Sequence, residues 1–133
     1  MTPDFNPLAS CTPPEAAPIP EHMVVLLLEG GQRHLAKAQE AIRSQNPMVR
    51  DHHINKVLGI LTELVTRLNH EQGSDLVDNL VRVYDWWGRE VVEAGVLNDE
   101  DRLKVISSQM GEIRKSWEQV LFQGEGLSEN PEF

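Results

Sequence analysis

The sequence has one cysteine and no apolar run long enough to cross a bilayer. A single cysteine, Cys11, cannot build a disulfide framework, and it fits a reducing compartment. The first residues contain no basic region followed by an apolar stretch, so no leader peptide is predicted. The longest apolar run covers residues 23–28, far short of the ~20 residues that span a membrane. We therefore expect a cytoplasmic protein without membrane insertion.

Aromatic residues and strand-like alternation are also scarce. Aromatic side chains make up only 5% of the chain, so a core has to be built mainly from Leu, Val, Ile and Ala. No segment has the alternating pattern of a β-strand. This composition favours helices packed on helices over a β-sandwich.

Basic residues are few, with 12 Lys and Arg against 21 Asp and Glu, which gives a net charge of −9. Both ends of the chain are acidic and contain no base, and the part between them is mildly acidic. We expect no basic face for nucleic acid or anionic lipid, and we interpret the excess of acids as an aid to solubility.

The usual motifs of metal and catalytic sites are missing. A di-metal helical bundle needs Glu-x-x-His pairs, but none of the five histidines has a carboxylate three residues before it. One cysteine cannot supply a structural zinc site. The chain has neither a Gly-x-Ser-x-Gly elbow nor a glycine loop for phosphate. We expect no metal, no cofactor and no enzymatic activity.

Four apolar stripes at helical spacing dominate the sequence, at about residues 21–44, 47–69, 74–94 and 98–122. The connections between them hold only a few residues, which makes consecutive helices antiparallel neighbours. The prediction is an all-α, antiparallel up-down four-helix bundle over residues 20–122. A Pro-rich extended arm (residues 1–19) precedes it, and a disordered acidic tail (residues 123–133) follows it.

Local signals set the expected helix ends. Asn46 caps the second helix and Pro47 is its first residue. Gly95 takes the left-handed position just past the third helix, and the fourth helix begins at Asn98. Glycines 30 and 31 interrupt the first helix, where they predict a close approach between helices.

The stripes also predict which side chains face the core. Met23 and Leu27 begin the expected core line of the first helix, and Leu76, Tyr84 and Trp87 belong to that of the third. A bundle helix buries only one stripe, yet residues 24–28 are apolar on every side and a second tryptophan precedes Trp87. This surplus indicates a groove for a partner. A wider buried face and a homodimer seam remain alternatives.

One stretch suggests a different function. The sequence His34-Leu35-Ala36-Lys37-Ala38 resembles the His-x-x-Lys-Gly box of histidine phosphotransfer domains, which are also four-helix bundles. The resemblance implies that His34 carries a phosphate in a phosphorelay. His34 and Lys37 share one face of a helix, as this chemistry requires.

Four ordered stretches resemble a second family, the FliS-type flagellin export chaperones. Residues 26–30 (LLLEG), 60–64 (ILTEL), 79–86 (NLVRVYDW) and 113–117 (IRKSW) match its boxes in order, over about residues 20–121. The Tyr of the first box is replaced by Leu28, and the Asn expected after Ala94 is replaced by Gly95.

This resemblance implies a cytoplasmic chaperone that binds the disordered C-terminal segment of flagellin, prevents its premature polymerisation and assists its delivery to the flagellar type III export apparatus. An apolar groove would hold the segment as it folds into helices. The box positions that match the family suggest five partner-binding residues: Leu28, Asn79, Tyr84, Asp85 and Trp86. In the arm, Phe5, Leu8 and Ile19 are expected to cover the empty groove.

Overall fold

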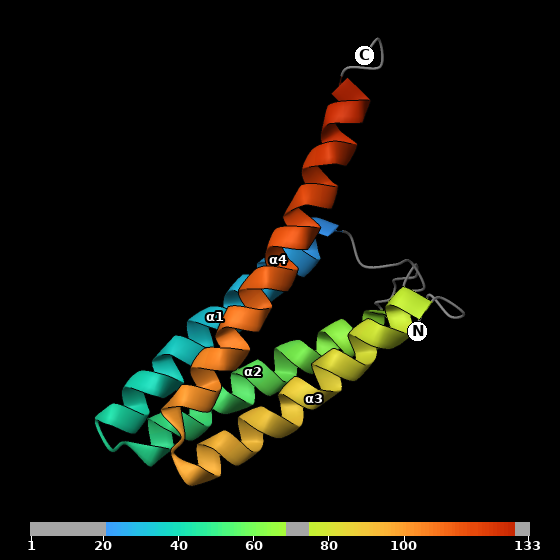
Figure 1. The fold of residues 1–133 in the computed structure, drawn as a ribbon. Helices are drawn as coiled ribbons and strands as arrows, with labels where there is room; N and C mark the ends of the chain where they lie inside the picture. The colour runs from blue at the N-terminus through green and yellow to red at the C-terminus, as the bar shows by residue number, and fades with distance from the viewer. Residues whose placement is uncertain (1–20, 69–74, 130–133) are drawn as a thin grey trace, which may run out of the picture.

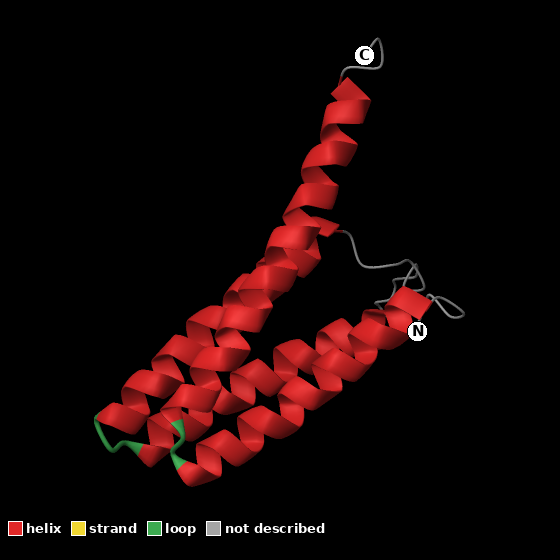
Figure 2. Ribbon diagram, in the orientation of Figure 1, coloured by secondary structure: helices red, strands yellow, loops and turns green. Residues whose placement is uncertain are grey.

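The computed structural model describes residues 21–68 and 75–129, and this part of the chain is helical apart from two short turns (Figure 2). The helices are α1 (Glu21–Arg43), α2 (Pro47–Leu68), α3 (Asp75–Leu97) and α4 (Glu100–Glu129). No strand occurs within these ranges. The prediction of an all-α fold with four helices is confirmed.

Consecutive helices run in opposite directions (Figure 1). Helix α1 packs on α2 and α4, and α3 packs less extensively on the same two helices. Figure 1 shows the α1–α4 pair and the α2–α3 pair diverging toward the end where α1 begins. Helix α4 extends past the rest of the bundle at that end.

The apolar stripe of α2 faces the core as expected: the residues at positions 54, 57, 61, 64 and 68 are buried, and Leu58 and Val65 are partly buried. Leu76 of the expected α3 stripe is instead 63% exposed. The start of α1 differs from the prediction. Val24 and Leu28 are buried, whereas Met23 is 40% exposed and Leu27 is only partly buried. A run that is apolar on every side has no polar residue to show which side faces out, so the spacing alone misplaced the core line by one residue.

The turn between α1 and α2 closes as a Schellman motif. Gln45 has a positive φ of 58°. The amide of Asn46 donates to the carbonyl of Ala41 at 2.8 Å, and that of Gln45 to the carbonyl of Ile42 at 3.1 Å. The side chain of Asn46 then accepts a hydrogen bond from the amide of Val49 at 3.2 Å. The predicted cap of the second helix is confirmed.

The turn between α3 and α4 corrects two expectations. Asn98, not Gly95, has the left-handed conformation (φ 53°), and α4 begins at Glu100. Gly95 lies inside α3 and is buried. A Cβ at Gly95 would lie 2.3 Å from Cδ1 of Ile54, so its glycine allows a close approach of α2 and is not a helix end.

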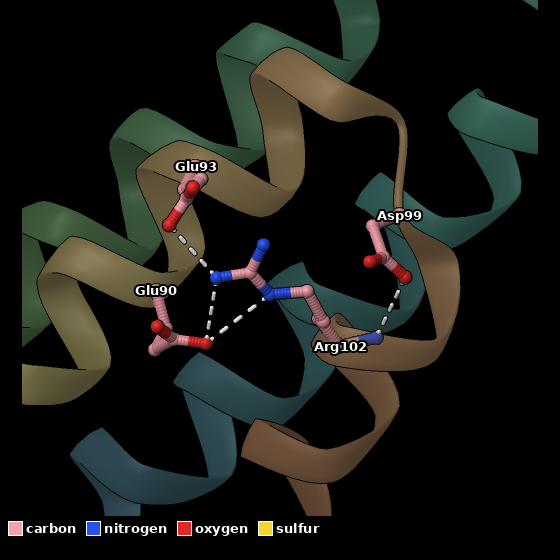
Figure 3. A network of polar contacts seen from close by, with 4 residues as sticks. All are labelled: Glu90, Glu93, Asp99 and Arg102. Carbon is pink, nitrogen blue, oxygen red and sulfur yellow. Dashed lines mark hydrogen bonds and ion pairs between the residues drawn. The ribbon is translucent and has the colours of Figure 1, made fainter.

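Arg102 holds the start of α4 against α3 (Figure 3). Its guanidinium contacts carboxylate oxygens of Glu90 and Glu93, each at 2.9 Å. Its backbone amide donates to the side chain of Asp99 at 3.2 Å, which caps α4. These contacts fix the α3–α4 turn, and Arg43 pairs with Glu100 beside it.

Glycines 30 and 31 stand where helices approach closely, as expected. A Cβ at Gly31 would lie 3.0 Å from Sδ of Met110 in α4, and one at Gly30 would lie 3.4 Å from Cδ1 of Ile60 in α2. Helix α1 therefore packs closely on both neighbours at this point.

The two ends of the chain are only partly covered by the structure. The arm, with Phe5, Leu8 and Ile19, lies outside the described residues. The backbone of residues 123–129 continues α4, whereas the sequence predicts a disordered tail from residue 123. Gly124 and Gly126 weaken a helix without forbidding it, and the first proline comes only at position 131. No described helix is both long and apolar enough to cross a membrane.

Candidate partner-binding groove

An open hollow of about 700 Å³ lies between α2 and α3, and we call it the α2–α3 groove. Its apolar lining comes from both helices: Leu58, Leu61 and Val65 of α2, and Tyr84, Gly88 and Val92 of α3. Polar side chains border it on both sides: Thr62 and Thr66 of α2, and Asp85, Arg89 and Glu93 of α3. A second, smaller hollow continues along the same seam past Val92 to Val96.

Helical spacing brings these residues into two facing rows. On α3, positions 84, 88 and 92 follow each other at one-turn intervals. Gly88 is central, because a Cβ there would already lie 3.9 Å from both Leu58 and Leu61. A larger side chain at this position would fill the hollow. The sequence analysis did not identify Gly88, since its role depends on the neighbouring helix.

Two of the five predicted partner-binding residues belong to the core. Leu28 and Tyr84 each have 0% exposure. Both side chains pack in the core in this conformation, and Tyr84 also lines the groove. The binding role of these two residues stays a prediction. Tyr84 also stood in the predicted core stripe of its helix, and that assignment is confirmed.

The other three predicted residues lie on the surface of α3 but not all together. Asp85 is exposed at the border of the groove. Asn79 is exposed and accepts a hydrogen bond from Arg82 at 2.7 Å. Trp86 is 40% exposed and follows Asn79 by two helical turns, so both lie on the same face. Glu90, one turn after Trp86, binds Arg102 of α4, which identifies that face as the α4 side of α3.

The hydroxyl of Tyr84 is buried beneath the groove. Its ring lies 5.4 Å from that of Trp87, and no described residue forms a hydrogen bond with its Oη within normal geometry. Burial raises the pKa of Tyr84 to about 12, and the nearby side chain of Trp117 acts in the opposite direction. The phenol is therefore neutral at physiological pH.

His34 does not stand free on its helix. Its Nδ1 lies 3.0 Å from Nδ1 of His53 in α2, within hydrogen-bond distance. Burial, and then the charge of His53, lower the pKa of His34. A phosphotransfer site needs an accessible ring nitrogen, and here one nitrogen is held by a second imidazole. The phosphorelay interpretation is not supported. Within the described residues, no three potential metal-binding side chains come together.

Comparison with known proteins agrees with the second resemblance. The family model described as flagellar protein FliS matches residues 16–124. The chain is 31% identical over 101 residues to a flagellar secretion chaperone, FliSB, of Pseudomonas aeruginosa. The aligned region covers 76% of this chain and 80% of that protein. It is 28% identical over 105 residues to the flagellar secretion chaperone FliS of Vibrio cholerae, covering 79% and 77% of the two chains. Because the family model matches most of the chain and the identity to FliSB is 31%, the chain belongs to the FliS family of flagellar proteins.

Proposed function

We propose that this chain is a cytoplasmic, non-enzymatic export chaperone that binds the disordered C-terminal segment of flagellin. By holding that segment, it prevents premature polymerisation and assists delivery to the flagellar type III export apparatus. The observation that carries the proposal is the open apolar groove between α2 and α3 in a member of the FliS family.

The shape and lining of the groove support recognition of a helix. Two antiparallel helices form its walls, and a third helix can lay an apolar face between them. Apolar contacts with Leu58, Val65 and Val92 would supply most of the binding energy. The charges of Asp85 and Arg89 at its border would fix the register of the bound helix.

The exposed residues on the other side of α3 extend the proposed binding surface. Trp86 is large and 40% exposed, and Asn79 lies two turns before it. A flagellin segment longer than one helix would cover the groove and then pass over this face. Exposed tryptophans often contribute strongly to such interfaces.

The arm has a matching role in the proposal. Phe5, Leu8 and Ile19 are large apolar residues in a Pro-rich stretch. We infer that they cover the groove while it is empty and leave it when flagellin binds. Deleting residues 1–18 would then strengthen flagellin binding.

A charged residue placed in the groove tests the proposal. Val92 borders the groove and is 47% exposed, while Val105 of α4 is 52% exposed and lines none of the described hollows. Val92→Glu should weaken binding of the flagellin C-terminal segment by about tenfold or more. Val105→Glu introduces the same charge at equal exposure and should bind as the wild type does. Equal binding by the two variants would remove the groove from the proposal.

A further inference from the structure

Six basic or titratable side chains gather on the outer side of the α1–α2 pair, and we call them the histidine patch. They are Arg33, His34 and Lys37 of α1, and His52, His53 and Lys56 of α2. His34 and His53 are half-buried, and the other four are exposed. This basic patch was not predicted from the sequence. Charge counted along the chain does not reveal that two helices bring their basic residues together at one seam.

The two half-buried imidazoles form the centre of the patch. Their Nδ1 atoms are 3.0 Å apart and their ring centroids 5.2 Å apart. The ring of His52 meets that of His53 edge-on at 4.9 Å. At this distance one Nδ1 donates and the other accepts, so His34 and His53 cannot both be fully protonated while the contact lasts.

Among the described residues, every charged group that acts on this pair is basic. Arg33, Lys56 and His52 act on His34, and Lys37, Lys56 and His52 act on His53. Together with burial, which is the larger cause, they lower the pKa of both imidazoles. None of the carboxylates of α1 and α2 whose side chains the structure describes, and none of the described charged groups of α3 and α4, acts on the pair.

The arrangement is unfavourable for the bundle on its own. Arg33 and Lys37 are four residues apart on one helix, and like charges at this spacing destabilise a helix. Carboxylates outnumber bases by 21 to 12, yet Arg33, Lys37 and Lys56 form no ion pair within the described part of the chain. By contrast, Arg67 and Arg102 pair with nearby glutamates.

We propose that the histidine patch is a docking surface for an acidic peptide segment of a partner protein. Arg33 and Lys37, one turn apart on α1, and Lys56 on the adjacent α2 carry three permanent positive charges. This arrangement suits a few consecutive carboxylates. The remainder of the chain is strongly acidic and would repel a long polyanion such as nucleic acid. A bound carboxylate takes the place of the contact between the two imidazoles, and each ring then donates to the peptide.

The patch is separate from the α2–α3 groove. His53 and Lys56 lie on the side of α2 that meets α1, whereas Leu58, Leu61 and Val65 line the seam with α3. An acidic segment can therefore dock while the groove is filled. The patch would give the chaperone a second partner that binds independently of flagellin.

The test measures fluorescence anisotropy of a fluorescein-labelled hexaglutamate peptide added to the full chain at low salt. Lys37→Glu combined with Lys56→Glu reverses two charges in the patch. Lys104→Glu combined with Lys115→Glu serves as the control of equal net charge. It reverses two exposed charges on α4 that form no ion pair with a described residue. The patch variant should bind about tenfold more weakly than the control. Circular dichroism checks that both variants are folded, and both should bind the flagellin segment alike.

Three results would overturn the proposal. Equal weakening in both double variants would show only diffuse attraction between opposite charges. No peptide binding by the wild type would show that the patch does not bind an acidic segment. Binding of a single-stranded oligonucleotide or of phosphatidylserine vesicles through Lys37 and Lys56, without binding of the peptide, would assign the patch to another class of partner.

The pH dependence of binding tests the part played by the histidines. Glutamates remain ionised from about pH 6 to 8, so only the imidazoles change charge over that range. A bound carboxylate favours the protonated rings, so peptide affinity should rise as the pH falls from about 7.5 to 6. Replacing His34 and His53 by glutamine should reduce this rise. A wild-type affinity that does not change with pH would overturn their role.

Discussion

Trp86 and Trp87 are consecutive in α3 but have opposite environments. Trp87 has 0% exposure, and its Nε1 donates to Oε1 of Gln109 at 2.7 Å. Trp86 is 40% exposed. Successive residues point about 100° apart around a helix, so only one of the two can face the core. The pair therefore separates residues that stabilise the bundle from residues available to a partner.

Trp87→Ala should lower the free energy of unfolding by ~3–5 kcal/mol, because it leaves a cavity in the core. It also leaves the side chain of Gln109 without its partner. Trp86→Ala should cost less than about 1 kcal/mol, since much of that ring is already in water. Urea denaturation followed by circular dichroism measures both. Equal losses in the two variants would contradict the assignment of faces.

Trp86→Ala should instead weaken binding of the flagellin segment by about tenfold. The matched control is Val49→Ala, which removes an apolar side chain of the same 40% exposure from the first turn of α2, outside the groove and the Trp86 face. Calorimetry with each variant gives the two affinities. Wild-type affinity in Trp86→Ala would confine flagellin to the α2–α3 groove.

Two glycines should respond in opposite ways to the same substitution. Gly59 of α2 has nothing within 4 Å of a Cβ, so Gly59→Ala should stabilise the protein by about 0.5–1 kcal/mol through helix propensity. At Gly95 a Cβ would lie 2.3 Å from Cδ1 of Ile54. The unfolding free energy of Gly95→Ala should therefore be about 1–3 kcal/mol lower than that of Gly59→Ala. Thermal denaturation compares them, and a stabilised Gly95→Ala would show that the approach of the helices is loose.

Acid should weaken the bundle in part through His34 and His53. Burial lowers the pKa of both below the ordinary value of 6.5, so the folded protein binds fewer protons than the unfolded chain. Their contribution to stability is complete above pH 6.5 and is lost as the pH falls through the lowered pKa values. The melting temperature should therefore drop more between about pH 7.5 and 5 in the wild type than in His34→Gln combined with His53→Gln. Equal drops would show that the pair does not contribute.

The four helices were predictable because each signal was local. Asn46 and Pro47 mark a helix start whatever surrounds them, and the apolar spacing of α2 places Val57 and Leu61 in the core. Where the local pattern was ambiguous, the prediction failed. Leu28 is buried and Leu27 only partly so, because residues 24–28 offer no polar side chain to set the orientation of α1.

The functional surfaces were less predictable because they depend on contacts between helices. Gly88 looks like any helical glycine until Leu58 and Leu61 face it. His34 and His53 are 19 residues apart, and no spacing rule brings them together. Matching positions to a family box selected Tyr84 and Trp86 equally, although only Trp86 reaches the surface.

The most direct test of the account is isothermal titration of this protein with the last ~40 residues of flagellin from the same organism. We expect saturable 1:1 binding with a large negative heat-capacity change and a gain of helicity, as coupled folding in an apolar groove requires. If the arm covers the groove tightly, the chain without residues 1–18 binds where the intact chain does not. Absence of binding by both forms would contradict the proposal that flagellin is the partner.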